Sequence, residues 1–194
     1  MKKQTLALSA ALILALLAST IARAEDNKTY AGISLTTPGE FSLRLGNSTT
    51  INNANNPTSL KIYSGLKLVD GWAAELGYGA FGSFHFKDPS AGSKDKGKIS
   101  VQALTLAARH SWELNDSFTF FGKLGMAYNR FSYSDTLGQS EHASFVKPMF
   151  GFGVELKLGS HWSVPLEFEY LGKSNTKFGR IQQEKLEIGL RRSF

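Results

Sequence analysis

The chain closes on the stretch KLEIGLRRSF (residues 185–194), in which apolar residues fall on alternate positions: Leu186, Ile188, Leu190 and Phe194. Charged or small residues take the positions between them. Successive side chains of a β-strand point to opposite faces, so this spacing of two predicts a strand with one apolar face. A helix would scatter the same residues around its axis. The chain therefore ends on a strand, and the question is whether a protein core or something else covers its apolar face.

The same alternation recurs along most of the chain. It predicts strands over seven ranges from residue 60 onward: 60–69, 72–87, 98–114, 117–133, 145–159, 162–172 and 181–194. Three of the connections are short turns, at Asp70-Gly71, Asn115-Asp116 and Ser160-His161, and these alternate with long polar segments. This order is typical of an up-and-down barrel in an outer membrane, which has tight turns on one side and longer loops on the other.

The number of strands depends on residues 28–57. If both chain ends lie on the same side of the membrane, the strand count is even, and this segment supplies one strand or three. YAGISL (30–35) and EFSLRL (40–45) keep the same parity across Thr37-Pro38-Gly39, which favours one long, kinked strand. The sequence therefore predicts an all-β fold, an eight-stranded antiparallel up-and-down transmembrane β-barrel. Ten strands are the alternative.

The first 24 residues have the features of a cleaved secretory signal. Lys2 and Lys3 precede an apolar run, and Ala22-Arg23-Ala24 closes it. The run is short for a spanning helix, which argues against a membrane anchor. We expect a signal peptide at 1–24 and a barrel domain at 25–194. Removal of the three basic residues of the leader lowers the formal net charge from +6 to +3, so the basic character is weak evidence for nucleic acid and we expect no such partner.

Aromatic residues mark two levels on the apolar faces. Trp72, Trp112 and Trp162 each lie next to a short turn. Further along the same faces a second set recurs: Tyr78, Tyr128 and Tyr170. Ten residues of tilted strand span about 25 Å, which matches the height of the apolar band of a membrane barrel. We therefore expect these six residues to form two aromatic girdles at the lipid interfaces.

Charged residues gather on the opposite parity, where positive and negative side chains nearly balance. The set includes Lys61, Lys67, Glu75, Arg109, Glu113, Lys123, Glu155, Lys157, Glu167, Glu169, Lys185, Glu187 and Arg191. In the strands after residue 58, Arg192 is the one charged residue that we expect on the apolar face. In a soluble barrel the charged face would be solvated, whereas in a membrane barrel it fills the lumen, which eight strands leave just wide enough for packed side chains. The prediction is a plugged lumen and no diffusion pore.

Three segments resemble one known group of proteins: LNDSFTFFGKLGMAYNR (114–130), FGVELKLGSHWSVPLEFEYLGKSNT (152–176) and EIGLRRSF (187–194). The chain from residue 28 onward resembles the small eight-stranded outer-membrane barrels, the OmpA-like and opacity-type group. The resemblance implies the outer membrane of a Gram-negative bacterium, with outer-membrane lipid and lipopolysaccharide as neighbours. It also implies that the barrel-assembly machinery reads Phe194, Leu190 and Ile188. Arg192 departs from the group, which usually has an aromatic there, and Pro165 stands where an inward basic residue is common.

Residues for catalysis, cofactor binding or metal binding are not apparent. The chain has no cysteine and none of the common nucleotide, zinc-protease or hydrolase motifs. Ser140-Glu141-His142 holds the residue types of a triad, but adjacent loop positions rarely give triad geometry. Some small barrels remove acyl chains from lipid A with Ser, His and Glu on the lipid-facing wall. That wall offers only His110 with Ser64 here, so we predict no enzymatic activity and no cofactor.

The polar segment KDPSAGSKDKGK (87–98) is rich in lysine. A solvated tip explains it simply, but Lys94, Lys96 and Lys98 would also suit contact with lipopolysaccharide phosphates or a host surface glycan. The loops at 46–59, 87–98, 134–144 and 172–180 would form the contact surface. We therefore predict a monomeric protein with a structural, envelope-integrity and surface-interaction (adhesin-like) role. A lipid A-modifying enzyme and a narrow channel are the alternatives.

Overall fold

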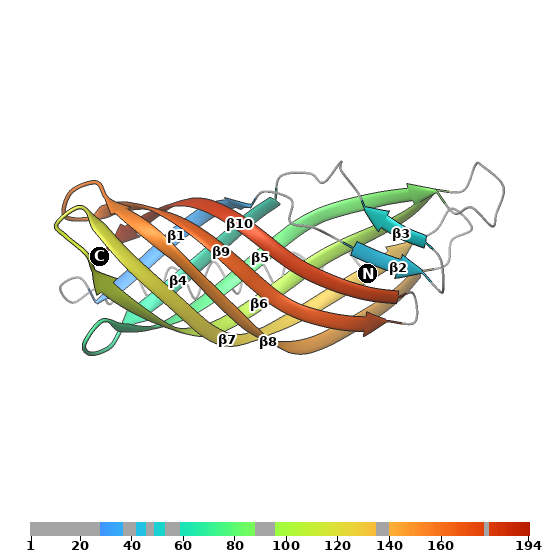
Figure 1. Cartoon of the computed structure of the whole chain (residues 1–194), viewed down its shortest axis with the longest axis horizontal. Helices are drawn as coiled ribbons and strands as arrows, with labels where there is room; N and C mark the ends of the chain where they lie inside the picture. Colours follow the sequence, from blue (N-terminus) through green and yellow to red (C-terminus); the bar gives the residue numbers. More distant parts are fainter. Residues whose placement is uncertain are drawn as a thin grey trace, which may run out of the picture.

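The computed structural model describes residues 28–36, 42–45, 49–52, 59–87, 96–134, 140–176 and 179–194 (Figure 1). Its strands are β1 (Thr29–Thr36), β2 (Ser42–Leu45), β3 (Thr49–Asn52), β4 (Ser59–Lys67), β5 (Trp72–Lys87), β6 (Lys96–Glu113), β7 (Phe118–Ser134), β8 (Ser140–Lys157), β9 (Trp162–Thr176) and β10 (Gly179–Ser193). β1 and β4 to β10 follow one another around the sheet, and β1 pairs with β10 to close it. The predicted eight-stranded antiparallel barrel is confirmed. No helix in the described part of the chain is long and apolar enough to cross a membrane.

The segment 28–57 differs from the prediction of one long, kinked strand, which is wrong. The barrel strand β1 ends at Thr36, and β2 and β3 form a separate short hairpin. β2 pairs with the first residues of β10, through Ser42–Gln182 to Arg44–Arg180, and so extends the sheet at one end of the barrel (Figure 1). The shared parity of the two segments is real, but parity does not say which strand a segment pairs with.

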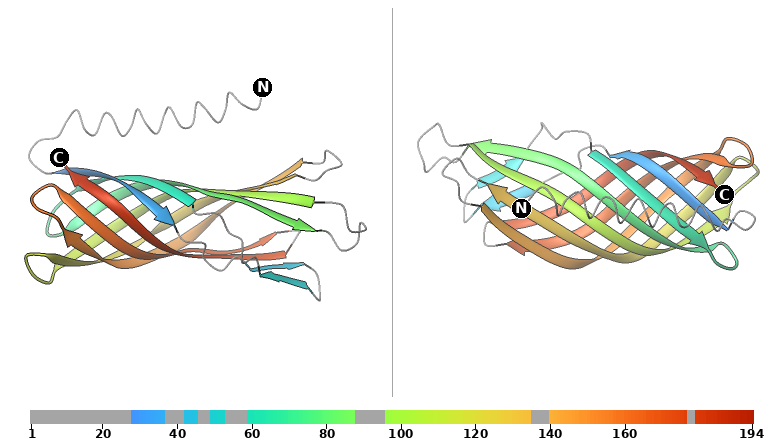
Figure 2. Two further views of the ribbon diagram at one scale, coloured as in Figure 1. Left: turned by 90° about the horizontal axis from the view of Figure 1, so that it is seen from above. Right: turned by 180° about the vertical axis from the view of Figure 1, so that it is seen from behind.

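The two ends of the barrel differ in their connections. The turns between β4 and β5, β6 and β7, and β8 and β9 lie together at the end that holds the C-terminus, which we call the short-turn end (Figure 2). The β2–β3 hairpin lies at the opposite, long-loop end. Several strands run further toward the long-loop end than predicted, because β6 begins at Lys96, β8 begins at Ser140 and β9 continues to Thr176. The segments 134–144 and 172–180 are thus mostly strand.

The barrel wall has an apolar outer face and a polar inner face. On β7, Leu124 is 70% exposed and Met126 is 49% exposed, whereas their neighbours Lys123 and Ala127 are buried. The same alternation holds on β6, where Leu106 is 62% exposed between the buried Thr105 and Ala107. A large, continuous apolar surface of this kind is not tolerated in water and is typical of a barrel that contacts lipid.

Two tyrosines fill the lumen next to glycines of the neighbouring strand. Tyr30 of β1 pairs with Gly65 of β4, and Gly32 pairs with Tyr63. A Cβ atom added to Gly65 would lie 2.1 Å from the Tyr30 ring, and one added to Gly32 would lie 2.3 Å from the Tyr63 ring. The glycines therefore provide the space in which each ring folds across the paired strand, an arrangement known to support glycines in sheets.

Candidate functional site

The lumen contains three groups of ion pairs, and the first lies near the short-turn end. The Glu155 carboxylate, 1% exposed, accepts a hydrogen bond of 2.5 Å from Arg109 Nη2 and forms an ion pair with Arg191 Nη2. The Arg109 guanidinium also lies 4.2 Å from the centre of the Phe121 ring, and that of Arg191 lies 4.7 Å from the centre of the Tyr30 ring. One buried carboxylate thus serves two stacked arginines, and loss of that carboxylate would leave both unpaired.

The second and third groups follow along the lumen toward the long-loop end. Lys123 Nζ donates to Glu75 at 2.5 Å and to Glu167 at 2.7 Å, and the Tyr30 hydroxyl donates to the second Glu75 oxygen at 2.9 Å. Lys61 Nζ lies 2.5 Å from Glu169 and 3.1 Å from Glu187, and Lys185 is buried beside them.

The structure therefore brings together the lumen charges expected from the sequence: Glu75, Arg109, Lys123, Glu155, Glu167, Glu169 and Arg191. These side chains are joined in the lumen by ion pairs and hydrogen bonds. Buried charges of this kind are tolerated when they are paired.

Residues predicted at the lipid interfaces lie on the outer face. Trp72, Trp112 and Trp162 are about half exposed and sit beside the three short turns. The imidazole of His110 lies between two of them, with ring centres 4.6 Å from Trp72 and 4.4 Å from Trp112. Nearer the long-loop end, Tyr128 is 45% exposed, and the Tyr78 and Tyr170 side chains are partly exposed.

The outer face carries more charge than predicted. Arg130 on β7 is exposed and shares the outward parity of Tyr128, and Glu184 on β10 shares that of Leu186. The prediction that Arg192 is the one charge on this parity is therefore wrong. Arg130 lies two residues past Tyr128 toward the long-loop end, and Glu184 is the partner of Tyr170 in the β9–β10 ladder, at the edge of the apolar band. Alternation of apolar residues is required only within the apolar band, and beyond it both faces of a strand meet a polar medium.

The C-terminal strand closes the barrel. Leu190 and Ile188 are exposed on the outer face of β10, and the backbone N–H of Phe194 donates to the Thr29 carbonyl at 2.9 Å. Arg192, the departure noted above, has its guanidinium 5.5 Å from the Trp162 ring centre and 5.1 Å from that of Phe194. The cation thus lies against the aromatic rings at the short-turn end, where it is close to the membrane surface. Pro165 faces Glu155 in the β8–β9 ladder.

The proposed polyanion contacts are placed differently from the prediction. Lys96 and Lys98 belong to β6 and not to a loop, because β5 continues to Lys87 and pairs with them. Lys94 lies outside the described residues. The β5–β6 register places Lys87 opposite Lys96 and His85 opposite Lys98. The β2–β10 register places Arg44 opposite Arg180. Lys87 and Lys96 belong to the lysine-rich segment 87–98 noted in the sequence, whereas Arg44 and Arg180 come from distant segments, so their pairing is not apparent from the sequence.

The described residues show little of the side-chain geometry that catalysis or metal binding requires. Ser140, Glu141 and His142 are consecutive residues of β8 and not of a loop, which corrects the prediction, and consecutive strand residues point to alternate faces. His142 instead lies beside a different serine, with its Nδ1 3.0 Å from Ser132 Oγ. Across the residues with described placement, no group of three or more His, Cys, Asp or Glu side chains has the arrangement of a metal site.

Comparison with known sequences identifies the family. The model of the OmpA-like transmembrane domain matches residues 24–190. Outer membrane protein P5 of Haemophilus influenzae is 26% identical over 95% of this chain and 55% of its own length. Outer membrane protein A of Serratia marcescens is 30% identical over 60% of this chain and 33% of its own length. The chain thus spans about half the length, or less, of these relatives.

Solved structures share the fold. Neisserial surface protein A has a TM-score of 0.61 at 15% identity, covering 86% of this chain and 97% of its own. Ail, the attachment invasion locus protein of Yersinia pestis, solved in complex with the heparin analogue sucrose octasulfate, has a TM-score of 0.56 at 15% identity, covering 86% and 99%. At this identity the likeness concerns the fold alone. From the family match and the barrel, the chain belongs to the OmpA-like transmembrane domain family and is a protein of the Gram-negative outer membrane.

Proposed function

We propose that the protein is a monomeric, non-enzymatic barrel that supports the envelope and contacts anionic polymers through its long-loop end. One observation carries the proposal: the register at that end pairs basic residues directly opposite one another, Lys87 with Lys96 and Arg44 with Arg180. Like charges at directly opposed positions of a sheet destabilise it. A bound polyanion, such as lipopolysaccharide phosphates or a sulfated host glycan, would supply counter-charge to such pairs.

The strands of the long-loop end support this role. β5 continues nine residues past Tyr78 to Lys87, and β7 continues six residues past Tyr128 to Ser134. With the tyrosines as the outer interface, these ends form a rigid rim above the membrane, on which loops would be positioned for contact. That Ail was solved with a heparin analogue is a property of that protein, and it makes a sulfated glycan the natural first probe here.

The short-turn end and the outer face would serve membrane insertion. In this proposal the tryptophans and tyrosines anchor the barrel at the two interfaces, and Phe194, Leu190 and Ile188 are read by the barrel-assembly machinery. The paired lumen charges keep the barrel closed. Planar-bilayer recordings of the purified protein should show no stable conductance at low voltage, and a reproducible open channel of uniform size would contradict this part of the proposal.

The polyanion contact is tested with a charge-removal variant. The double substitution Lys96→Gln and Lys98→Gln should weaken binding of heparin and of lipopolysaccharide to the purified barrel. Added salt should do the same, because exposed charges are screened within about 10 Å at 0.1 M. The matched control, Lys28→Gln with Lys157→Gln, removes two lysines at the short-turn end and should bind as the native protein does. Equal binding by the two double variants would overturn the proposal.

One observation favours a second candidate, hydrolysis of lipid acyl chains. Ser132 and His142 lie 3.0 Å apart on outward positions of β7 and β8, at the long-loop end. A serine beside a histidine is the core of a hydrolase nucleophile, although no carboxylate is hydrogen-bonded to this histidine among the described residues. Release of fatty acids from lipid A that disappears in Ser132→Ala would move the protein to the enzyme class. Absence of release in the native protein would remove this candidate.

A further inference from the structure

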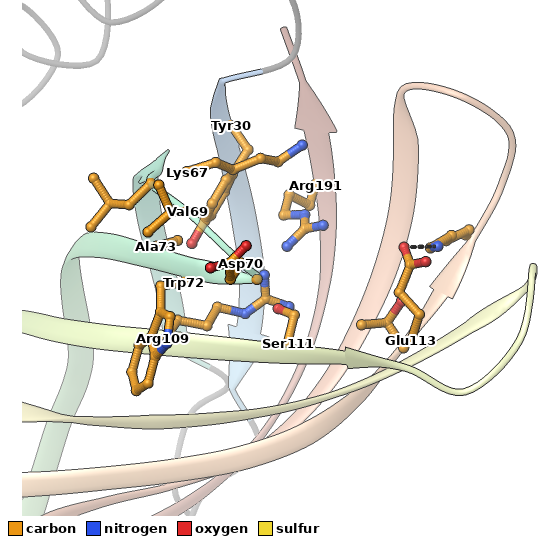
Figure 3. A pocket seen from close by; sticks show the side chains of 14 residues that line it. Tyr30, Lys67, Val69, Asp70, Trp72, Ala73, Arg109, Ser111, Glu113 and Arg191 are labelled. Atoms are coloured by element: carbon orange, nitrogen blue, oxygen red, sulfur yellow. Dashed lines mark hydrogen bonds and ion pairs between the residues drawn. The ribbon is translucent and has the colours of Figure 1, made fainter.

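A pocket of about 450 Å³ opens into the lumen at the short-turn end, opposite the surface discussed above (Figure 3). Its walls come from β1, β4, β5, β6, β7, β8 and β10 and from the β4–β5 turn. The volume lies within the usual range for small-molecule sites. Short turns face the periplasm in outer-membrane barrels, so the pocket would be reached from that side.

Positive charge exceeds negative charge in this pocket. Lys67, Arg109, Lys157 and Arg191 are its basic lining residues. Lys157 is paired with Glu113 at 2.7 Å, near the solvent. The two arginines share the carboxylate of Glu155, and Glu75, which accepts a hydrogen bond from the lining Tyr30, offsets part of the remaining positive charge.

Lys67 adds a further positive charge that no acid balances. Its ammonium makes one hydrogen bond, of 3.4 Å, to the neutral hydroxyl of Ser193, and within the described part of the chain it forms no ion pair. In Figure 3 the Lys67 side chain extends across the pocket toward the strand that carries Arg191. The remaining acidic lining residue, Asp70, is an exposed residue of the turn and lies at the rim. The pocket lining therefore carries more positive than negative charge.

Buried hydrogen-bonding groups in the pocket also lack partners. Arg191 has a side chain that is 12% exposed, and it uses Nη2 for Glu155. Its Nε has no hydrogen-bond partner among the described residues, and neither has Thr119 Oγ1 on the opposite wall. Buried donors without partners cost free energy, and each such group calls for an explanation. The Arg191 side chain lines the pocket, and a guanidinium is suited to an oxyanion.

We propose that this pocket is a binding site for a phosphate-type dianion, either inorganic phosphate or a small phosphomonoester. The basic lining residues outnumber the acidic ones, Arg191 supplies a guanidinium, and Lys67 supplies a point charge from β4. Because the pocket is larger than a phosphate group, an attached organic substituent has room toward the turn of residues 68–71. The site lies at the opposite end of the barrel from the proposed polyanion surface and does not depend on it.

The test is titration calorimetry of the full-length refolded barrel in a zwitterionic detergent. Inorganic phosphate and glycerol 3-phosphate are the two probes, at constant ionic strength set with chloride. Tighter binding of glycerol 3-phosphate would identify a phosphomonoester as the ligand, and equal binding would identify the phosphate group alone. Binding no tighter than that of chloride for both probes would overturn the proposal.

Three variants separate the site from general charge effects. Lys67→Gln removes a cation without an acidic partner, and it should weaken binding about tenfold while the barrel stays folded by its heat-dependent gel migration. Asp70→Asn removes a negative charge at the rim and should strengthen binding about twofold, and asparagine tolerates the left-handed conformation of this residue (φ 49°). Lys173→Gln, exposed at the far end of β9, is the charge-matched control and should leave binding unchanged. Equal affinity of Lys67→Gln and Lys173→Gln would contradict the proposal.

Discussion

The two faces of the barrel wall are built from the same strands and obey opposite rules. On the outer face, large apolar side chains such as Leu106 and Leu124 are exposed. On the inner face, neighbouring residues such as Lys123 and Glu155 are buried and joined to named partners over short distances. Lipid accepts any apolar side chain of roughly the right size, whereas each inner charge depends on one or two specific partners. The outer face therefore fixes where the protein resides, and the inner face fixes how tightly its lumen is closed.

The largest effect is expected from breaking an inner ion pair. Glu155→Gln keeps the volume of the side chain but leaves Arg109 and Arg191 buried without a carboxylate. We expect the free energy of unfolding to fall by about 3–5 kcal/mol, the usual cost of removing one partner of a buried pair. Urea titration of the folded barrel in phospholipid vesicles, followed by tryptophan fluorescence, measures this.

Glu113→Gln is the matched control for this variant. Glu113 pairs with Lys157 at 2.7 Å in the same end of the barrel, but its side chain is 76% exposed. An exposed pair contributes little, so the loss should be under about 1 kcal/mol. If both substitutions cost the same, the inner pairs contribute no more than surface pairs and the contrast between the faces fails.

A smaller loss is expected from placing a charge on the outer face. Leu124→Arg puts a cation in the middle of the apolar band and should cost about 2–4 kcal/mol in the same urea titration. Leu114→Arg makes the same change beside the short turn that follows Trp112, where about 0–1 kcal/mol is expected. A similar cost at the two positions would show that residue 124 does not face the interior of the membrane.

The smallest effect comes from a single hydroxyl group in the lumen. Tyr30→Phe removes a hydrogen bond of 2.9 Å to the Glu75 carboxylate, and we expect a loss of about 1.5–3 kcal/mol. Tyr63→Phe is the control, because the Tyr63 hydroxyl is buried and has no hydrogen-bond partner among the described residues. Its removal should leave stability unchanged or slightly raised. A larger loss for Tyr63→Phe than for Tyr30→Phe would contradict the assigned hydrogen bonding.

Much of the barrel follows from the spacing of residues, and the exceptions have physical causes. Strands β4 to β10, the three short turns and the inward parity of the charges are all apparent in the sequence. The β2–β3 hairpin is not, because residues 40–45 keep the alternation of β1 while pairing with β10. The strand ends at Lys96 and Ser140 differ from the predicted loops, because a strand that extends beyond the membrane needs no apolar face and so lacks the alternation by which strands are predicted.

The contents of the lumen were predictable only as a set. Parity selects the charged residues and shows that they nearly balance, but the shear of the barrel decides which of them meet. The shear places Arg109 and Arg191 beside Glu155, whereas Lys67 has no acidic partner among the described residues. The inward tyrosines were missed altogether, although Tyr30 and Tyr63 each lie on the inward parity of a strand that also carries an inward glycine. The signal in the sequence was that each of these strands carries one inward tyrosine and one inward glycine two residues away, so that each tyrosine can lie opposite a glycine.

The most direct test of the closed lumen uses two adjacent alanines of β6. Ala107 is buried in the lumen and Ala108 is exposed on the outer face, and the native chain contains no cysteine. Ala107→Cys and Ala108→Cys would be treated, in vesicles, with a charged thiol reagent and with a lipid-soluble maleimide, with Ser117→Cys in a short turn as the reactive control. We predict that residue 107 reacts with neither reagent and residue 108 with the lipid-soluble one alone. Rapid reaction of residue 107 with the charged reagent would show a water-filled lumen and contradict the account.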